Sequence, residues 1–151
     1  MTPRMDNPAR LLPGSFEAVL ALKAAADGGG VAPRVLDLVH LRASQINVCA
    51  SCVQGGFAQA RRGGESDERL AQVASWRDSD AFTAPERAAL ALAESVTRLA
   101  DAADPVPDGV WDEAARHYDE RALAALVLWT ATTNVFNRLN VATRQVPGEW
   151  G

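Results

Sequence analysis

Apolar and polar residues follow one another along this chain with the period of an α-helix. Between residues 84 and 100 the apolar positions recur every three or four residues: Ala89, Leu92, Ala93, Val96 and Leu99. The same spacing continues through residues 120–147, and no sustained run alternates apolar and polar residues as a half-buried strand would. The pattern therefore predicts an all-α protein.

Capping residues set the expected ends of about six to seven helices. Ser15 and Asp119 are of the type that caps a helix start. Thr83 and Glu86 have the spacing of a capping box, and Pro33 suits a first helical turn. Glycine pairs and prolines mark the expected helix ends. The expected helices cover residues 15–28, 33–47, 49–63, 66–76, 84–100, 110–117 and 120–147.

The composition indicates one ordinary domain. A chain of 151 residues with 48% hydrophobic and 23% charged residues can bury one core. We therefore expect a single domain over residues 1–151, with its core at about 15–148 and its termini as arms or tails.

Charge and hydropathy argue against two classes of partner. The net charge of −4 is small and the arginines are scattered among acids, so we expect no nucleic-acid binding. The chain has no apolar run of about 18 residues and no signal-peptide pattern at its start, so we expect no membrane association and a cytoplasmic location. In the cytoplasm, two nearby cysteines serve catalysis or metal binding more often than a structural disulfide.

A polar stripe runs along the expected helix over residues 33–47 and leads to the two cysteines. Four polar residues share one edge of this helix: Asp37, His40, Ser44 and Asn47. Such a stripe is ordinarily a solvated face. Here it precedes Cys49 and Cys52, a Cys-x-x-Cys pair at the start of the next helix, where free N–H groups and the helix dipole favour thiolate over thiol. The pair predicts redox chemistry.

These residues resemble the alkylhydroperoxidase D-like and carboxymuconolactone decarboxylase family. Its redox members carry an acid twelve residues before the first cysteine, and Asp37 stands twelve residues before Cys49. The likeness includes LRASQIN (41–47), PERAALALAE (85–94) and NVFNRLNVATRQVP (134–147), and it covers roughly residues 15–148.

The resemblance implies an all-helical fold that assembles into trimers or hexamers and acts as an antioxidant thiol peroxidase or disulfide oxidoreductase. It casts Cys52 as the nucleophile that attacks a hydroperoxide, Cys49 as the resolving cysteine and Asp37 as part of a proton relay. Electrons would come from an external thiol or dithiol, such as a lipoylated protein. No metal, flavin or nucleotide motif is present in the sequence, so we expect no cofactor.

The chain departs from the family pattern at two positions of the relay. The expected glutamate is the shorter Asp37, and the expected histidine, four residues after the second cysteine, is Gly56. General acid–base assistance is typically worth about 10²- to 10⁴-fold, so the loss of this imidazole matters. We hypothesise that His40, one turn from Asp37, replaces it as a proton shuttle and is oriented by that carboxylate. His117 is assigned no catalytic role.

Other interpretations stay open. The cysteines are compatible with an inert buried pair and, less well, with structural zinc, which usually takes four ligands. Lactone decarboxylation is found mostly in family members without this redox pair. The main alternative is a non-catalytic oligomeric binding or redox-sensing protein that has lost the proton relay. Four further residues match shared family positions: Arg42, Asn134, Arg138 and Asn140. Asn134 and Arg138 lie one turn apart on the last expected helix, and we expect them to bond buried carbonyls or acids across a helix or subunit contact.

Overall fold

The computed structural model describes residues 2–100 and 102–148. These residues form helices and no strands, which confirms the all-α prediction, and their helix count is slightly above the six to seven expected. The elements are α1 (Pro8–Leu11), α2 (Ser15–Asp27), α3 (Pro33–Ile46), α4 (Ala50–Arg62), α5 (Asp67–Ala71), the 3₁₀ helix η1 (Gln72–Asp78), α6 (Ala84–Thr97), α7 (Asp108–Ala115) and α8 (Glu120–Thr143).

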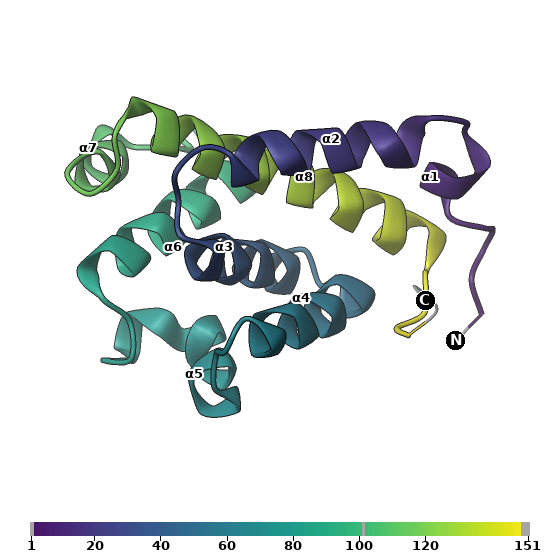
Figure 1. The fold of residues 1–151 in the computed structure, drawn as a ribbon, viewed down its shortest axis with the longest axis horizontal. Helices are drawn as coiled ribbons and strands as arrows, with labels where there is room; N and C mark the ends of the chain where they lie inside the picture. The colour runs from purple at the N-terminus through teal and green to yellow at the C-terminus, as the bar shows by residue number, and fades with distance from the viewer. Residues whose placement is uncertain (1, 101, 149–151) are drawn as a thin grey trace.

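Helix α3 lies at the centre of the fold. It packs against α4, α6, α8 and η1, while α2 lies along α8 on one side of the molecule (Figure 1). The two ends of the described chain meet, since the Arg4 N–H donates to the Thr143 carbonyl at 2.8 Å and the Gln145 side chain donates to the Met5 carbonyl at 2.9 Å. The first turn of α4, which carries the cysteines, lies at this end of the molecule (Figure 1).

The capping signals act as the sequence predicts for three of the helices. The Asp119 carboxylate accepts a hydrogen bond from the Ala122 N–H, and Thr83 and Glu86 form the capping box of α6. Pro33 occupies the first turn of α3. These are local interactions, so they can be read from short stretches of sequence.

Three details of the prediction are wrong. Helix α1 was not expected. Ser15 does not cap α2: Gly14, in the left-handed conformation, takes that position, and the Ser15 hydroxyl donates to the Leu12 carbonyl at 2.5 Å. The last helix ends at Thr143 instead of residue 147, because Arg144 adopts the left-handed conformation at φ 55°.

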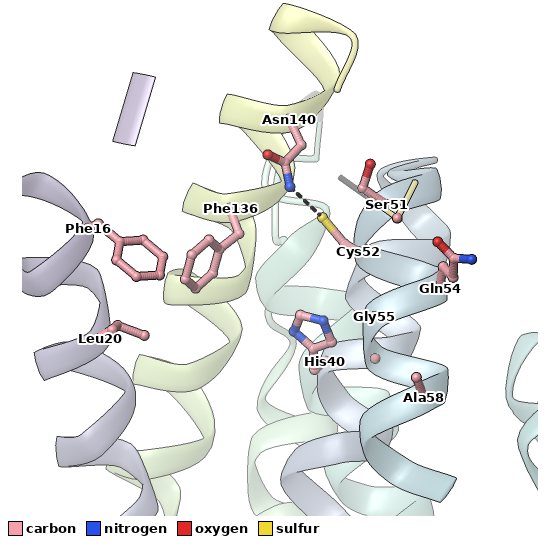
Figure 2. A pocket seen from close by; sticks show the side chains of 12 residues that line it. Phe16, Leu20, His40, Ser51, Cys52, Gln54, Gly55, Ala58, Phe136 and Asn140 are labelled. Atoms are coloured by element: carbon pink, nitrogen blue, oxygen red, sulfur yellow. Dashed lines mark hydrogen bonds between the residues drawn. The ribbon is translucent and has the colours of Figure 1, made fainter. Parts of the chain in front are cut away.

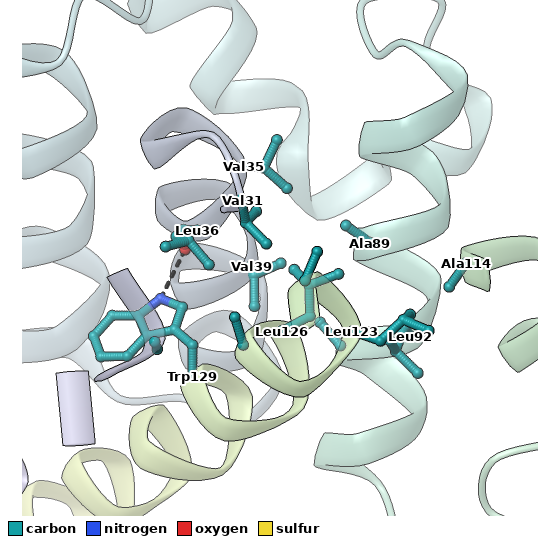
Figure 3. Packing of buried hydrophobic residues seen from close by; sticks show 14 residues of the cluster. Val31, Val35, Leu36, Val39, Ala89, Leu92, Ala114, Leu123, Leu126 and Trp129 are labelled. Carbon is teal, nitrogen blue, oxygen red and sulfur yellow. Dashed lines mark hydrogen bonds between the residues drawn. The ribbon is translucent and has the colours of Figure 1, made fainter. Parts of the chain in front are cut away.

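The main apolar cluster lies between α2, α3, α6, α7 and α8 (Figure 3). The Trp129 ring is buried there, and its Nε1–H donates to the Leu36 carbonyl at 2.9 Å, which satisfies the polar end of the indole. The end of α2 approaches α8 so closely that a Cβ on Gly29 would lie 2.2 Å from the Ala125 Cβ. Only glycine allows this contact.

A second apolar cluster, beneath α4, α5 and η1, is bordered by a buried ion pair. Arg42 on α3 donates to Glu94 on α6 at 2.6 Å, and the indole N–H of Trp76 donates to the same carboxylate at 2.9 Å. Burial by itself would raise the pKa of Glu94, but hydrogen bonds from Trp76, Arg77 and Arg42 outweigh it and hold the pKa below its usual value. Arg42 thus binds a buried acid.

Within residues 2–100 and 102–148, no helix combines the length and the apolar character that crossing a bilayer requires.

Candidate functional site

The cysteine pair forms the start of α4. Cys49 is the N-cap residue, and its Sγ accepts a hydrogen bond from the Cys52 N–H at 3.3 Å. The two cysteines are joined in a disulfide, with Cα atoms 5.3 Å apart. Both are buried, at 2% and 7% exposure respectively. The sequence places the pair where a helix N-terminus favours the thiolate form, and the fold keeps it there.

Cys52 lines an apolar cavity of about 460 Å³, and Cys49 is not among its lining residues (Figure 2). Phe16 and Leu20 reach the cavity from α2 and Phe136 reaches it from α8, while residues of the first two turns of α4 form the opposite wall. The cavity therefore gives a small apolar molecule access to one sulfur of the pair. Sequence reasoning did not find this wall, because it is assembled from helices far apart in the chain.

The polar stripe of α3 faces protein over most of its length. The Ser44 Oγ accepts from the Asn137 amide at 3.1 Å, and the Asn47 amide donates to Asn137 Oδ1 at 2.8 Å and to Asn134 Oδ1 at 2.9 Å. The solvated-face interpretation is therefore wrong for this part of the stripe. Together with His40 and Thr133, these residues form a polar seam between α3 and α8, which we call the α3–α8 seam.

His40 occupies the space beside Gly56. A Cβ on Gly56 would lie 2.6 Å from the ring Cδ2 and 3.2 Å from Nε2, so the imidazole fills the volume that a side chain at position 56 would need. The ring stacks on Trp129 with centroids 5.5 Å apart, and its Nδ1 lies 3.2 Å from the Thr133 Oγ1. The imidazole therefore reaches the region of position 56 from α3 instead of α4.

Burial controls the ionisation of His40. It lowers the pKa of the ring to about 4, although a hydrogen bond with the main chain of Cys52 acts in the opposite direction and Lys23 adds a small lowering. The ring is therefore neutral at pH 7. A neutral imidazole that donates to the Cys52 main chain leaves Nδ1 free to accept from the Thr133 hydroxyl.

Asp37 lies at the opposite end of α4 from the cysteines. A Cβ on Gly63 would be 3.5 Å from its Oδ2, and at 1.5 Å per residue Gly63 is about 16 Å along the helix axis from Cys52. Burial raises the pKa of Asp37, and the neighbouring charges of Lys23, Asp27, Glu65 and Arg62 partly offset one another. The structure thus brings together Cys49, Cys52 and His40 but places the Asp37 carboxylate at the far end of α4 from the cysteines.

The remaining residues considered from the sequence have structural partners. The His117 ring lies 3.3 Å from Glu113, away from the cysteines. Arg138 donates to the Asn134 side chain at 2.9 Å. Asn140, by contrast, points its amide nitrogen at the Cys52 Sγ, 3.2 Å away (Figure 2). Among the described residues, no three His, Cys, Asp or Glu side chains are grouped as ligands for a metal ion.

Comparison with known proteins assigns this chain to a family. The model of the carboxymuconolactone decarboxylase family matches residues 13–95. The uncharacterized protein YdfG of Bacillus subtilis is 34% identical over 106 residues, which are 70% of this chain and 71% of that protein. The uncharacterized protein YnjA of Escherichia coli is 36% identical over 111 residues, 73% of this chain and 59% of that protein.

Solved structures share the fold. A protein of unknown function from Agrobacterium tumefaciens, named as a candidate antioxidant defence protein AhpD, superposes with a TM-score of 0.89 at 29% identity, over 97% of this chain and 98% of that one. The debrominase Bmp8, in complex with 2,3,4-tribromopyrrole, has a TM-score of 0.80 at 21% identity over 93% and 74% of the two chains, which shows the fold alone. The family model covers more than half of the chain, and this protein therefore belongs to the carboxymuconolactone decarboxylase family.

Proposed function

We propose that the protein is a thiol-dependent hydroperoxide reductase that uses Cys52 as its nucleophile and Cys49 as its resolving cysteine. The observation that carries the proposal is that Cys52 lines the apolar cavity while disulfide-bonded to Cys49. The position of both residues at the start of α4 supports it, since that position favours the reactive thiolate.

The reaction proceeds in two steps from the reduced pair. The Cys52 thiolate attacks the distal oxygen of the hydroperoxide, the O–O bond breaks, and the products are Cys52 sulfenic acid and an alkoxide that takes a proton to become the alcohol. The Cys49 thiolate then attacks the Cys52 sulfur, forms the S–S bond and releases hydroxide, which leaves as water. An external dithiol reduces the disulfide by exchange. A lipoylated protein is our candidate for this reductant.

The cavity favours organic hydroperoxides over hydrogen peroxide. The walls contributed by Phe16, Leu20 and Phe136 offer apolar contact to an alkyl or aryl group. Hydrogen peroxide has no such group and gains nothing from these walls. We therefore expect cumene hydroperoxide to react faster than hydrogen peroxide at equal concentration.

His40 is our candidate for the proton shuttle. Its ring lines the same cavity as Cys52 and fills the space beside Gly56. The neutral ring has one lone pair, on Nδ1, which in the resting state faces the Thr133 hydroxyl. When that hydroxyl turns to another acceptor, Nδ1 can take the thiol proton of Cys52 and pass it to the departing alkoxide. The depressed pKa makes it a weak base, so its contribution belongs near the lower end of the usual range, about 10²-fold.

The test is stopped-flow oxidation of the reduced protein by cumene hydroperoxide, followed by loss of free thiols. Wild type should form its disulfide much faster than dithiothreitol does. Cys52→Ser should abolish the reaction, Cys49→Ser should stop at a sulfenic acid that dimedone traps, and His40→Ala should slow it. Oxidation no faster than that of dithiothreitol would overturn the proposal. That result would favour the alternative of a redox-sensing or binding protein, which the glycine at position 56 makes the main competitor.

A further inference from the structure

The side chain of Asn140 contacts the sulfur that the proposed reaction uses. Its Nδ2 lies 3.2 Å from the Cys52 Sγ, and both side chains are buried (Figure 2). An amide can turn either its NH₂ or its oxygen toward a neighbour. The NH₂ stabilises a thiolate by donating a hydrogen bond, whereas the oxygen would repel it. The orientation of this amide therefore decides its effect on Cys52.

The N-terminal segment fixes that orientation. The main-chain N–H of Ala9 can only donate, and it lies 2.9 Å from the Asn7 Oδ1. The NH₂ of Asn7 therefore points the other way, where it donates to the Asn140 Oδ1 at 2.7 Å. This leaves only the NH₂ of Asn140 for the Cys52 sulfur. Asn7, at 4% exposure, is as buried as its partner, so water does not compete for these bonds.

Charged groups on the neighbouring helices do not replace this donor. His40 of α3 is neutral at pH 7 because burial lowers its pKa to about 4. Arg138 of α8 donates to Asn134. The first turn of α4 carries no acidic residue, and the described residues that line the cavity include no lysine or arginine.

The charges of the other adjoining segments also have partners or surroundings of their own. Asp6 and Arg10 of the N-terminal segment line a separate cavity together with Asn7, and Arg4 donates to the Ala142 carbonyl at 3.0 Å. Between α4 and α5 the ion pair is Arg61 with Asp67, at 2.7 Å and at the end of α4 away from the cysteines. On α2, which also lines the cavity, Lys23 pairs with Asp27 at 2.6 Å and Glu17 is exposed. The helix N-terminus and the Asn140 amide are thus the groups placed to stabilise a thiolate at Cys52.

We propose that Asn140 is a catalytic residue of this site, which donates an oriented hydrogen bond to the Cys52 thiolate, and that Asn7 is the positioning residue that turns the amide the right way. The role in turnover rests on the proposed function, but the effect on thiol ionisation does not. Hydrogen bonds to charged groups are strong enough that losing this one should raise the Cys52 pKa by about 1 to 2.

The direct test measures the pKa of Cys52 in a Cys49→Ser background, from the pH dependence of alkylation by iodoacetamide. Asn140→Ala should raise the pKa by about 1 to 2. Asn140→Asp keeps the shape and the bond from Asn7 but sets an oxygen against the sulfur, so it should raise the pKa at least as far. In urea, where the chain is unfolded, Cys52 should be alkylated at the same rate in every variant. Unchanged circular dichroism without urea shows that each variant is folded.

A second variant changes the amide orientation without changing any residue that touches the sulfur. An aspartate in place of Asn7 still accepts from the Ala9 N–H but offers an oxygen to Asn140, whose amide must turn its NH₂ away from Cys52. We expect Asn7→Asp to raise the Cys52 pKa nearly as much as Asn140→Ala does. In the double variant Asn7→Asp/Asn140→Ala the two effects should not add, because the carboxylate introduced at position 7 acts through the amide that is gone.

The outcomes separate this proposal from the proposed function. A Cys52 pKa that stays within about 0.3 of the parent value in Asn140→Ala and in Asn7→Asp overturns the role of Asn140, whatever the peroxidase activity. Fully additive effects of the two substitutions overturn the positioning role of Asn7 and assign its effect to charge alone. If the pKa shifts as expected while the reduced wild-type protein does not react with peroxide, the role of Asn140 in thiol ionisation stands and the proposed function fails.

Discussion

The two halves of α8 are buried to similar extents by different chemistry. The first half places apolar side chains in the main core: Ala122, Leu123, Ala125, Leu126 and Trp129. The second half buries mainly polar ones: Thr130, Thr132, Thr133, Asn134, Asn137, Asn140 and Thr143. One continuous helix thus supports the fold at one end and faces the cysteine helix at the other.

The difference shows that hydrogen bonds, which fix the orientation of side chains, are concentrated next to the cysteine site. Apolar burial stabilises in proportion to area and fixes no orientation. Several hydroxyls of the second half, such as that of Thr130, simply bond the carbonyl one turn earlier on the same helix. Other polar side chains of the second half bond to neighbouring helices instead. Thr133 bonds His40 and Asn137 bonds Ser44, both on α3, and Asn140 bonds Cys52 on α4. These bonds hold particular atoms toward the cavity.

The largest effect on stability should come from breaking the apolar half. Leu126 is 1% exposed, so Leu126→Ala should leave a cavity and lower the free energy of unfolding by about 4 kcal/mol, near the upper end for buried leucines. Urea denaturation measures this loss. The folded fraction should keep the alkylation rate of Cys52, because the α3–α8 seam is untouched. A stability loss below about 1 kcal/mol would show that the apolar half is not the main support.

The stability of the region around the polar half should depend on pH, because its Thr133 contacts the buried ring of His40 on α3. His40 has a pKa of about 4 in the folded chain and about 6.5 when unfolded, so between these values only the unfolded chain binds the proton. The contribution of the neutral His40 ring to the free energy of unfolding is fully present above pH 6.5 and is lost as the pH falls through 4. It amounts to about 3 kcal/mol.

Chemical denaturation at a series of pH values tests this. The free energy of unfolding of wild type should fall between pH 6.5 and 4 more steeply than that of His40→Gln, which lacks the titrating ring. Leu126→Ala should show the wild-type slope at a lower overall stability. Parallel curves for wild type and His40→Gln would mean that the ring is not held in its neutral form.

The local parts of this fold could be predicted from sequence, and the tertiary parts could not. Thr83, Asp119 and Pro33 act within one helical turn, so their helices were placed well. Helix α1 carries the same kind of signal, with Asn7 as cap and a following proline, but it is only four residues long and was missed. The end of α8 depends on contacts with the N-terminal segment, which no short window of sequence contains.

The site divides in the same way. The Cys49–Cys52 pair is contiguous and was found, whereas the partners of Cys52 and His40 come from segments about 90 residues away. Thr133, Asn137 and Asn140 recur at helical spacing and so share one face of α8, and this was the available signal. Gly56 appeared as the loss of a histidine, because only the packing of α3 on α4 shows which ring fills its place.

Replacing Asp37 should have the smallest effect of these substitutions, and it tests the proton relay of the family pattern directly. If Asp37 were part of a proton relay, its removal would lower the rate of peroxide-driven thiol loss 10²-fold or more. Asp37 instead lies against Gly63, among Lys23, Asp27, Glu65 and Arg62, and mobile ions screen a charge at such a distance from Cys52. We therefore expect Asp37→Asn to change the rate of peroxide-driven thiol loss less than twofold, as Asp27→Asn should. A tenfold loss confined to Asp37→Asn would instead establish a longer proton path along α3, through His40 to the cavity.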